Sequence, residues 1–274
     1  DAQEIGAEFL ENEKVRKISF TGSTAVGKYL MEQSAKQVKK VSMELGGHAP
    51  YIVFPDADLE RAANDLIFNK FQNNGQTCIC ANRIFVHEEV AEAFISKFVE
   101  KMKQVKVGNG MGDVNVGPLI HEHALAKVES HVQDALAKGA RLVCGGFRLK
   151  DGDFAKGAFY APTVITGVTE EMDIFHEETF GPVAPFITFR TEEEVIRMAN
   201  ATPYGLAAYF YTRDLATTMR VADQLEYGMI GINESALGYV QAPFGGIKQS
   251  GTGREGGHHG MHDFLEYKYL NLNF

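Results

Sequence analysis

The feature that most constrains the fold of this chain is a regular alternation between short apolar runs and longer segments with helical spacing. The apolar runs are rich in β-branched and aromatic residues and have the length of buried strands. They cover residues 15–20, 41–45, 51–54, 83–86, 141–144, 183–189, 206–211 and 229–232. Strand and helix alternation on this scale predicts an α/β fold with a mostly parallel sheet.

Between these runs, apolar residues recur every three or four positions, as they do on one face of a helix. The predicted helices cover residues 24–37, 59–71, 90–105, 124–137, 192–200 and 215–225. In the first of them, Val26, Leu30 and Met31 form the apolar face.

Both ends of the chain carry their own signals. Residues 1–12 have helical character but no initiator methionine, so we expect this chain to be entered midway, with further residues upstream. Residues 266–274 alternate as an aromatic strand without an obvious partner nearby. An unpaired strand is a site for pairing with another chain, so this tail is expected to join a second subunit.

Size and charge restrict the class of partner. The 274 residues allow one large domain or two smaller ones, and no apolar run approaches the roughly 20 residues of a membrane span. A net charge of −9 argues against nucleic acid or an anionic membrane as the main partner, because both require a basic surface. Three cysteines form neither an even disulfide framework nor a paired zinc motif. A small-molecule ligand and a cytoplasmic location are therefore expected.

Residues 17–28 read as a strand, a glycine turn and the start of a helix, which is a geometry that presents N–H groups to an anion. The spacing from Gly22 to Lys28 matches a Walker A loop, but Tyr29 stands where that loop needs Ser or Thr for magnesium. A nucleotide triphosphatase is therefore not favoured. The alternative is a helix that is simply capped by Ser23 or Thr24.

Cys78 lies in a polar, glycine-containing turn, Asn-Asn-Gly-Gln-Thr-Cys, directly after a predicted helix. A partly exposed thiol near backbone N–H dipoles is a strong nucleophile, whereas a free cysteine is otherwise usually a small buried hydrophobe. Cys80, two residues on, is a possible redox partner for Cys78. The ring of such a disulfide would depart from usual geometry, so packing of Cys80 beneath the loop is favoured.

Two acidic residues and a histidine cluster complete the candidates. Glu44 ends an otherwise apolar strand, so it needs a partner or acts as a base with a raised pKa. Glu178 precedes a turn and, judged alone, is a solvated acid. The group His258, His259 and His262 lacks the Glu and the outer ligand of the usual zinc helix, so we predict surface histidines and no metal.

Five phrases occur together and in order, at residues 20–24, 44–47, 75–78, 178–182 and 243–246. Together they resemble the successive motifs of the aldehyde dehydrogenase superfamily. Within it, the segments around Glu44, Cys78 and residues 242–255 are similar to the succinate semialdehyde dehydrogenase branch. The resemblance runs from residue 15 to the C-terminus, and the family's N-terminal segment is absent from it.

The resemblance implies a mechanism in which Cys78 attacks an aldehyde to give a thiohemiacetal, and hydride transfer to NAD or NADP leaves a thioester. Glu44 would then activate the water that releases the carboxylic acid. The oxyanion would be held by the Cys78 backbone N–H and by an Asn expected upstream of residue 1. The implied cofactor contacts are Phe20, Gly22, Ser23, Gly27, Glu178 and Phe180.

The resemblance also implies a division into three parts and assembly as a homo-oligomer, either a dimer or a tetramer. Residues 1–44 would complete the dinucleotide-binding domain, residues 45–250 would form the catalytic thiol domain, and residues 251–274 would return to the cofactor domain and end in an oligomerisation strand.

The substrate is where this sequence departs from the branch it resembles. That branch holds the substrate carboxylate with an Arg six residues before the nucleophile and a Ser before the Pro-Phe-Gly-Gly segment. Here those positions are Gln72 and Gly238, while Phe244 would line the aldehyde site. A neutral side chain binds a carboxylate less strongly than a charged one. We therefore expect succinate semialdehyde first and a neutral or hydroxylated aldehyde second, with a non-catalytic assembly fragment and a cofactor-free thiol esterase as alternatives.

Overall fold

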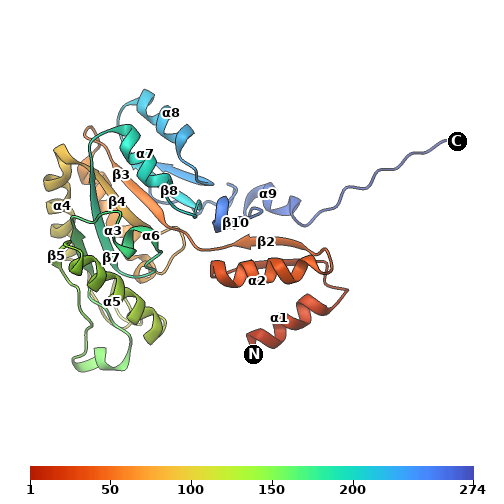
Figure 1. Cartoon of the computed structure of the whole chain (residues 1–274), viewed down its shortest axis with the longest axis horizontal. Helices are drawn as coiled ribbons and strands as arrows, with labels where there is room; N and C mark the ends of the chain where they lie inside the picture. Colours follow the sequence, from red (N-terminus) through yellow and green to blue (C-terminus); the bar gives the residue numbers. More distant parts are fainter.

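The computed structural model describes all residues from 1 to 274 and contains two β-sheets, which are joined by the segment that follows β2 (Figure 1). The larger sheet has seven strands in the order β5-β6-β7-β4-β3-β8-β9, and the smaller has three in the order β1-β2-β10. The prediction of an α/β fold with mostly parallel strands is confirmed. All neighbouring pairs are parallel except β5 with β6 and β10 with β2.

The smaller sheet is built from β1 (Lys17–Thr21), β2 (Lys40–Glu44) and the two-residue β10 (Gly251–Thr252). Helix α1 (Ala2–Glu11) precedes it, and helix α2 (Thr24–Ala35) connects β1 to β2. The predicted division at residues 44 and 250 stays a prediction. In the structure, β2 ends at Glu44 and β10 begins at Gly251.

The helix predicted here is present as α2, but the apolar residues predicted on one of its faces are not its buried residues. Val26 and Met31 are exposed, Leu30 is half-buried, and the buried residues of the helix are Gly27 and Ser34. A β-carbon at Gly27 would lie 2.3 Å from Leu45 Cδ2, so the helix meets the following segment through its smallest residue. Close approach of the backbone, and not the size of the apolar side chains, determines which face is buried.

The strands of the larger sheet are β3 (Ala49–Val53), β4 (Ala81–His87), β5 (Arg141–Cys144), β6 (Thr163–Thr166), β7 (Val183–Phe189), β8 (Ala207–Tyr211) and β9 (Met229–Ile232). Helices α3 (Leu59–Phe71) and α4 (Glu88–Met102) contribute to the core on one face of this sheet. Helices α5 (Glu122–Ala137), α6 (Asp173–His176), α7 (Glu192–Asn200) and α8 (Leu215–Gln224) contribute to the core on the other. The four-residue elements β6 and α6 were not predicted.

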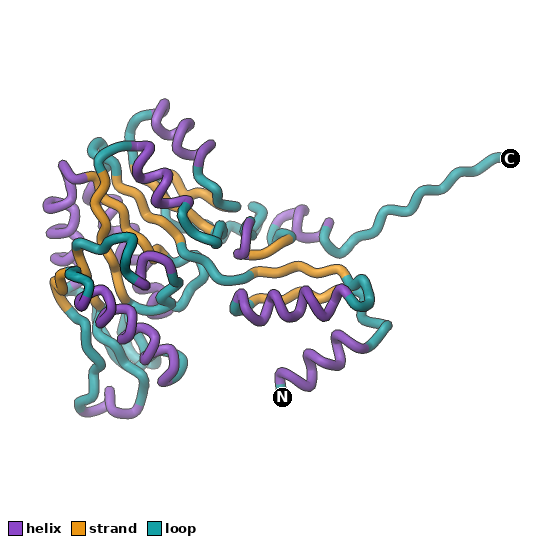
Figure 2. The backbone as a smooth tube through the Cα atoms, in the orientation of Figure 1, coloured by secondary structure: helices purple, strands orange, loops and turns teal.

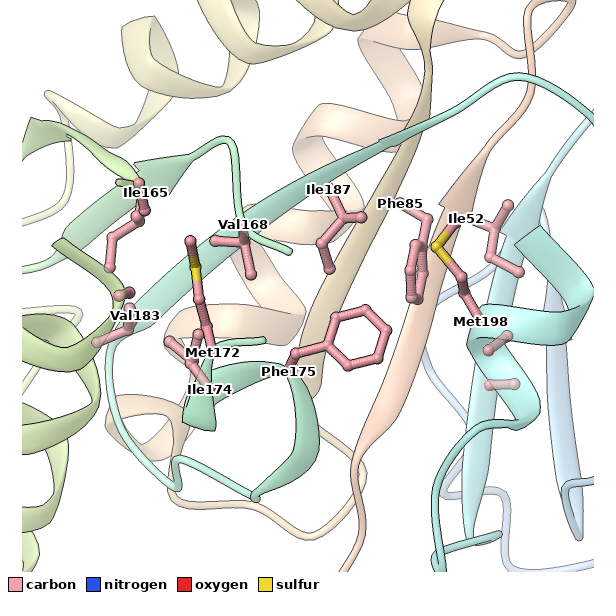
Figure 3. Packing of buried hydrophobic residues seen from close by; sticks show 14 of the residues in the cluster. Ile52, Phe85, Ile165, Val168, Met172, Ile174, Phe175, Val183, Ile187 and Met198 are labelled. Carbon is pink, nitrogen blue, oxygen red and sulfur yellow. The ribbon is translucent and has the colours of Figure 1, made fainter. Parts of the chain in front are cut away.

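Successive residues of the central strands point into different cores, as the pleat of a strand requires. Ile52 and Phe85 belong to one core and Tyr51 and Ile84 to the other. Figure 3 shows Phe175 of α6 directed toward Phe85, with ring centroids 6.2 Å apart. Both faces of the sheet are covered, which explains why its strands read as continuous apolar runs.

The chain ends in the short helix α9 (Gly257–His262) and an extended tail that runs away from the body of the protein (Figure 2). The strand predicted for residues 266–274 is not formed in the single chain, because no other strand lies beside it, and Tyr267 is 95% exposed. None of the helices combines the length and apolar character needed to cross a membrane.

Candidate active site

The strand pairing of β3 with β4 brings together two loops that lie far apart in the sequence. Ala49 at the start of β3 is paired with Ala81 at the start of β4, so the residues that precede the two strands are neighbours. A β-carbon at Gly47 would lie 2.1 Å from the carbonyl oxygen of Cys78. The Glu44–Gly47 loop therefore packs directly against the backbone of Cys78.

The loop that carries Cys78 has a backbone that few residue types adopt. Within the short element η1 (Gln72–Gly75), the φ angles of Asn73 and Asn74 are 47° and 61°, and that of Gly75 is 73°. Asparagine and glycine tolerate this left-handed region better than other residues do. A β-carbon at Gly75 would also lie 2.2 Å from the Gly181 carbonyl oxygen. The Asn-Asn-Gly sequence thus fixes the path of the chain into Cys78.

The Cys78 thiol is half-buried, and its pKa is raised to about 11. Burial is the main cause, the charges of Glu178 and Glu44 add to it, and the backbone N–H groups of Cys78 and Ile79 act in the opposite direction. The effect of the N–H dipoles, which was expected to activate this thiol, is therefore smaller than the opposing effects of burial and of the two carboxylates. Cys78 needs a proton acceptor to become a thiolate near neutral pH.

Glu44 lies at the end of β2, where only 5% of it is exposed, and its Oε2 has no hydrogen-bond partner. The pKa of this carboxyl group is raised to about 8, mainly by burial; the charges of Glu255 and Asp263 act in the same direction, and that of Arg254 acts against them. The carboxyl group is mainly neutral at pH 7 and ionises just above it. A pKa close to the working pH suits a group that takes up and releases protons.

Glu178 also faces the Glu44–Gly47 loop, since its Oε1 accepts a hydrogen bond of 3.0 Å from the backbone N–H of Gly47. Burial raises the pKa of Glu178 to about 7, while the Gly47 N–H and the charges of Lys127 and Lys70 lower it. The expectation of a solvated acid is wrong, because Glu178 is half-buried and its carboxylate is bound to the Gly47 N–H. Phe180 follows with a φ of 54°, which is strained for an aromatic residue.

The N-terminus of α2 adjoins the same loop. Thr24 Oγ1 accepts a hydrogen bond of 3.2 Å from the Gly46 N–H, and the Gly22 N–H donates to the Glu44 carbonyl at 3.0 Å. Ser23 caps the helix by accepting from the Val26 N–H at 3.4 Å, so of the two predicted caps the structure has Ser23. Half-buried Phe20 packs its ring against Gly22, where a β-carbon would lie 2.4 Å from it. The first turn of α2 contains no acidic residue, which leaves it free to accept an anion.

The three predicted substrate residues lie at different places. Gln72 is exposed, its side chain makes no hydrogen bond, and it lines a hollow of about 640 Å³ together with Phe68 and Lys101. Gly238 lies on the surface with no atom within 4 Å of an added β-carbon. Phe244 is half-buried against the core on which Cys78 also packs. The hollow beside Gln72 includes neither of the other two residues.

The remaining predicted residues lie outside the site formed by Cys78, Glu44 and Glu178. Cys80 is 1% exposed with its thiol directed at the Lys70 and Ala81 carbonyls, and all three cysteines are free, which is the packing that was favoured. His258, His259 and His262 are exposed on α9. No group of three or more His, Cys, Asp or Glu residues is positioned to hold a metal ion.

Sequence reasoning missed Ser250, which ties the site to the C-terminal part of the chain. Its buried Oγ donates to the Gly46 carbonyl at 2.7 Å and accepts from the Gly205 N–H at 3.0 Å. The backbone carbonyl of Ser250 also accepts from the Leu45 N–H at 2.9 Å. A lone serine after a glycine-rich segment gives no local signal of such contacts.

Comparison with known proteins gives one consistent family. The sequence matches the model described as "Aldehyde dehydrogenase family" over residues 1–270. It is 53% identical to 3-sulfolactaldehyde dehydrogenase of Pseudomonas putida over 99% of this chain and 55% of the relative. It is 51% identical to the NADP-dependent succinate-semialdehyde dehydrogenase of Escherichia coli K12, over 97% of this chain and 55% of the relative.

A solved structure agrees with these relatives. The crystal structure of succinate-semialdehyde dehydrogenase from Burkholderia pseudomallei superposes with a TM-score of 0.95 at 55% identity, covering 98% of this chain and 55% of that one. The chain therefore spans about half the length of the proteins it matches.

Proposed function

Since this chain belongs to the aldehyde dehydrogenase family, we propose that it carries the nucleophile and base of an NAD(P)-dependent aldehyde oxidation, Cys78 and Glu44. The observation that supports this proposal most is that Cys78, Glu44 and Glu178 meet at one loop, Glu44–Gly47. Gly47 contacts the Cys78 carbonyl and donates to Glu178, while Glu44 begins the same loop. A thiol and two carboxyl groups with raised pKa values thus share one site, as expected where protons are transferred.

In the proposed reaction, the Cys78 sulfur adds to the aldehyde carbon and its proton passes to the Glu44 carboxylate. The Cys78 backbone N–H stabilises the resulting oxyanion. A bound nicotinamide cofactor supplies a hydride acceptor. After oxidation, Glu44 releases the first proton to solvent and then removes a proton from the water that attacks the thioester. That second proton returns to the Cys78 sulfur as the carboxylic acid leaves, which restores the thiol.

The residues present fit such a cofactor at the N-terminus of α2. That turn lacks an acidic side chain, Gly22 allows a close approach of the backbone, and Ser23 begins the helix. We assign Phe20, Gly22, Ser23 and Gly27 to the side of the pyrophosphate. Glu178 and Phe180 are assigned to the nicotinamide and its ribose.

For the substrate, we propose a small aldehyde with an acidic group, and succinate semialdehyde first. The named activities of the relatives from Escherichia coli and Burkholderia pseudomallei support this choice. A hydroxylated aldehyde is the second candidate, because Gln72 supplies hydrogen bonds without charge and a relative at 53% identity is named for sulfolactaldehyde. We further propose that the exposed tail at residues 266–274 pairs with a second copy in a homo-oligomer.

The test is a panel of aldehydes assayed with NAD and with NADP for formation of the reduced cofactor. The panel contains succinate semialdehyde, glutarate semialdehyde, a hydroxylated aldehyde and a neutral aldehyde of equal chain length. The proposal predicts reduction that requires Cys78 and is fastest with the acidic semialdehydes. Ester hydrolysis without reduction of either cofactor would instead favour a thiol esterase.

A further inference from the structure

One face of α5 runs alongside the segment that carries Glu178. Asp134 accepts a hydrogen bond of 2.8 Å from the backbone N–H of Asp173, and three residues earlier His131 contacts Glu177 and Thr179. Val128, three residues before His131, packs against Gly181: a β-carbon on Gly181 would lie 2.4 Å from Val128 Cγ2. Residues spaced by three lie on the same face of a helix, so α5 contacts the whole segment from 173 to 181.

His131 is the polar centre of this contact. It is 3% exposed, its Nδ1 lies 3.2 Å from Thr179 Oγ1, and its Nε2 lies 3.3 Å from Glu177 Oε2. Burial lowers the pKa of this histidine, which favours the neutral ring. A neutral ring with its hydrogen on Nε2 donates to the Glu177 carboxylate and accepts from the Thr179 hydroxyl on Nδ1.

The two partners of His131 are the residues on either side of Glu178. The Phe180 backbone that follows has a φ of 54°, a conformation that persists only where the surroundings enforce it. Thr179 is 2% exposed and makes no other side-chain hydrogen bond than that to His131. The ring therefore holds both flanks of Glu178 while Gly47 holds its carboxylate.

We propose that His131 is a positioning residue that fixes Glu178 toward the Cys78 site, a role that rests on the proposed function for its catalytic consequence. His131 itself touches neither thiol nor carboxylate of the site. It acts through Glu177 and Thr179, so that the Glu178 carboxylate stays on the Gly47 N–H and beside Cys78.

The test uses two readouts in a Cys144→Ser background, so that alkylation reports on Cys78. The first is the pH profile of Cys78 alkylation by iodoacetamide, which requires neither cofactor nor aldehyde. Glu178 raises the pKa of Cys78, so a displaced carboxylate lowers the midpoint of this profile. The second is the KM for the nicotinamide cofactor, measured separately from kcat and from the KM for the aldehyde.

His131→Leu removes both ring contacts and is expected to lower the alkylation midpoint by about half a pH unit. We expect the cofactor KM to rise about tenfold and the aldehyde KM to stay within about twofold. His131→Asn keeps a polar atom near Thr179, so its alkylation midpoint and its cofactor KM should lie between those of the parent protein and those of His131→Leu. His123→Leu changes an exposed histidine of the same helix and should match the parent protein in every readout.

Thr179→Val is a smaller change and keeps the test decisive if His131→Leu folds poorly, because it removes only the Nδ1 contact. It is expected to shift both readouts in the same direction by a smaller amount. A folded His131→Leu or Thr179→Val protein with a lower Tm but an unchanged or higher midpoint and unchanged cofactor KM would overturn the proposal. A parent protein that reduces no cofactor, with the midpoint shift present, would sink the proposed function and leave the positioning of Glu178 intact.

Discussion

Gly47 lies so close to Cys78 that a β-carbon on the glycine would be 2.1 Å from the cysteine's carbonyl oxygen. The contact follows from the pairing of β3 with β4, since the loops that precede two paired parallel strands lie side by side. The glycine is thus required by the geometry of the site, and a larger residue there displaces the backbone that carries the thiol.

Gly47→Ala is expected to lower kcat/KM about 10²-fold, because a displacement of about 1 Å at a reacting group has an effect of that size. It should also lower the Tm. Gly110→Ala is the matched control, since Gly110 is exposed and an added β-carbon there meets nothing within 4 Å. Kinetics of Gly47→Ala equal to those of Gly110→Ala would contradict the assigned role of this contact.

Glu44→Gln removes the proton acceptor while keeping the size of the side chain. With the pKa of Glu44 at about 8, the parent steady-state rate should rise with pH through that value as the carboxylate forms. The variant should lose this rise and be slower by about 10²- to 10⁴-fold. The measurement is the pH profile of cofactor reduction. A variant that keeps the same rising limb would show that another group titrates.

The buried carboxyl groups also predict how stability depends on pH. The pKa of Glu44 is raised from 4.5 to about 8 on folding, so the folded state binds this proton more tightly than the unfolded state does. Its contribution to stability is full below about pH 4.5 and is lost as pH rises through about 8. Glu44→Gln should therefore reduce the loss of stability between pH 5 and pH 8, measured by urea unfolding.

Glu171→Gln, at an exposed position, is the control for this stability measurement and should leave the pH dependence as it is in the parent protein. If Glu44→Gln and Glu171→Gln show the same dependence on pH, then Glu44 is not buried in its neutral form in the folded protein.

Gln72→Arg adds a positive charge beside the Cys78 loop. Because Gln72 is exposed and its side chain makes no hydrogen bond, the change disrupts no contact. We expect kcat/KM for succinate semialdehyde, relative to a neutral aldehyde, to rise about tenfold, since a charge-assisted contact is about twice as strong as a neutral one. Gln104→Arg adds the same charge elsewhere in the same hollow. An unchanged ratio, or an equal effect of both variants, would refute a role for position 72 in substrate choice.

Local signals predicted much of the fold. Buried strands such as β7 and β9 have the predicted bounds, because strands covered on both faces read as apolar runs. The buried face of α2 was not predictable, since it depends on how closely Gly27 approaches Leu45 after folding. The terminal strand predicted at residues 266–274 needs a partner that a single chain does not supply.

The candidate site was predictable from the sequence only where a residue departs from its local pattern. Cys78 and Glu44 stand out because each interrupts a local pattern, one as a thiol in a polar turn and the other as an acid ending an apolar strand. The burial of Glu178 and the contacts of His131 and Ser250 depend on residues far away in the sequence. The raised pKa of Cys78 was also outside the reach of the sequence, because burial and two distant carboxylates cause it.

The most direct test of the central claim is to trap the acyl group on Cys78. The parent chain is mixed with succinate semialdehyde and each nicotinamide cofactor, quenched in acid within the first turnover, and analysed by peptide mass spectrometry. The account predicts a succinyl adduct on Cys78, and on neither Cys80 nor Cys144, that requires the cofactor and matches the reduced cofactor formed. The absence of both adduct and reduced cofactor, or an adduct on another residue, would contradict it.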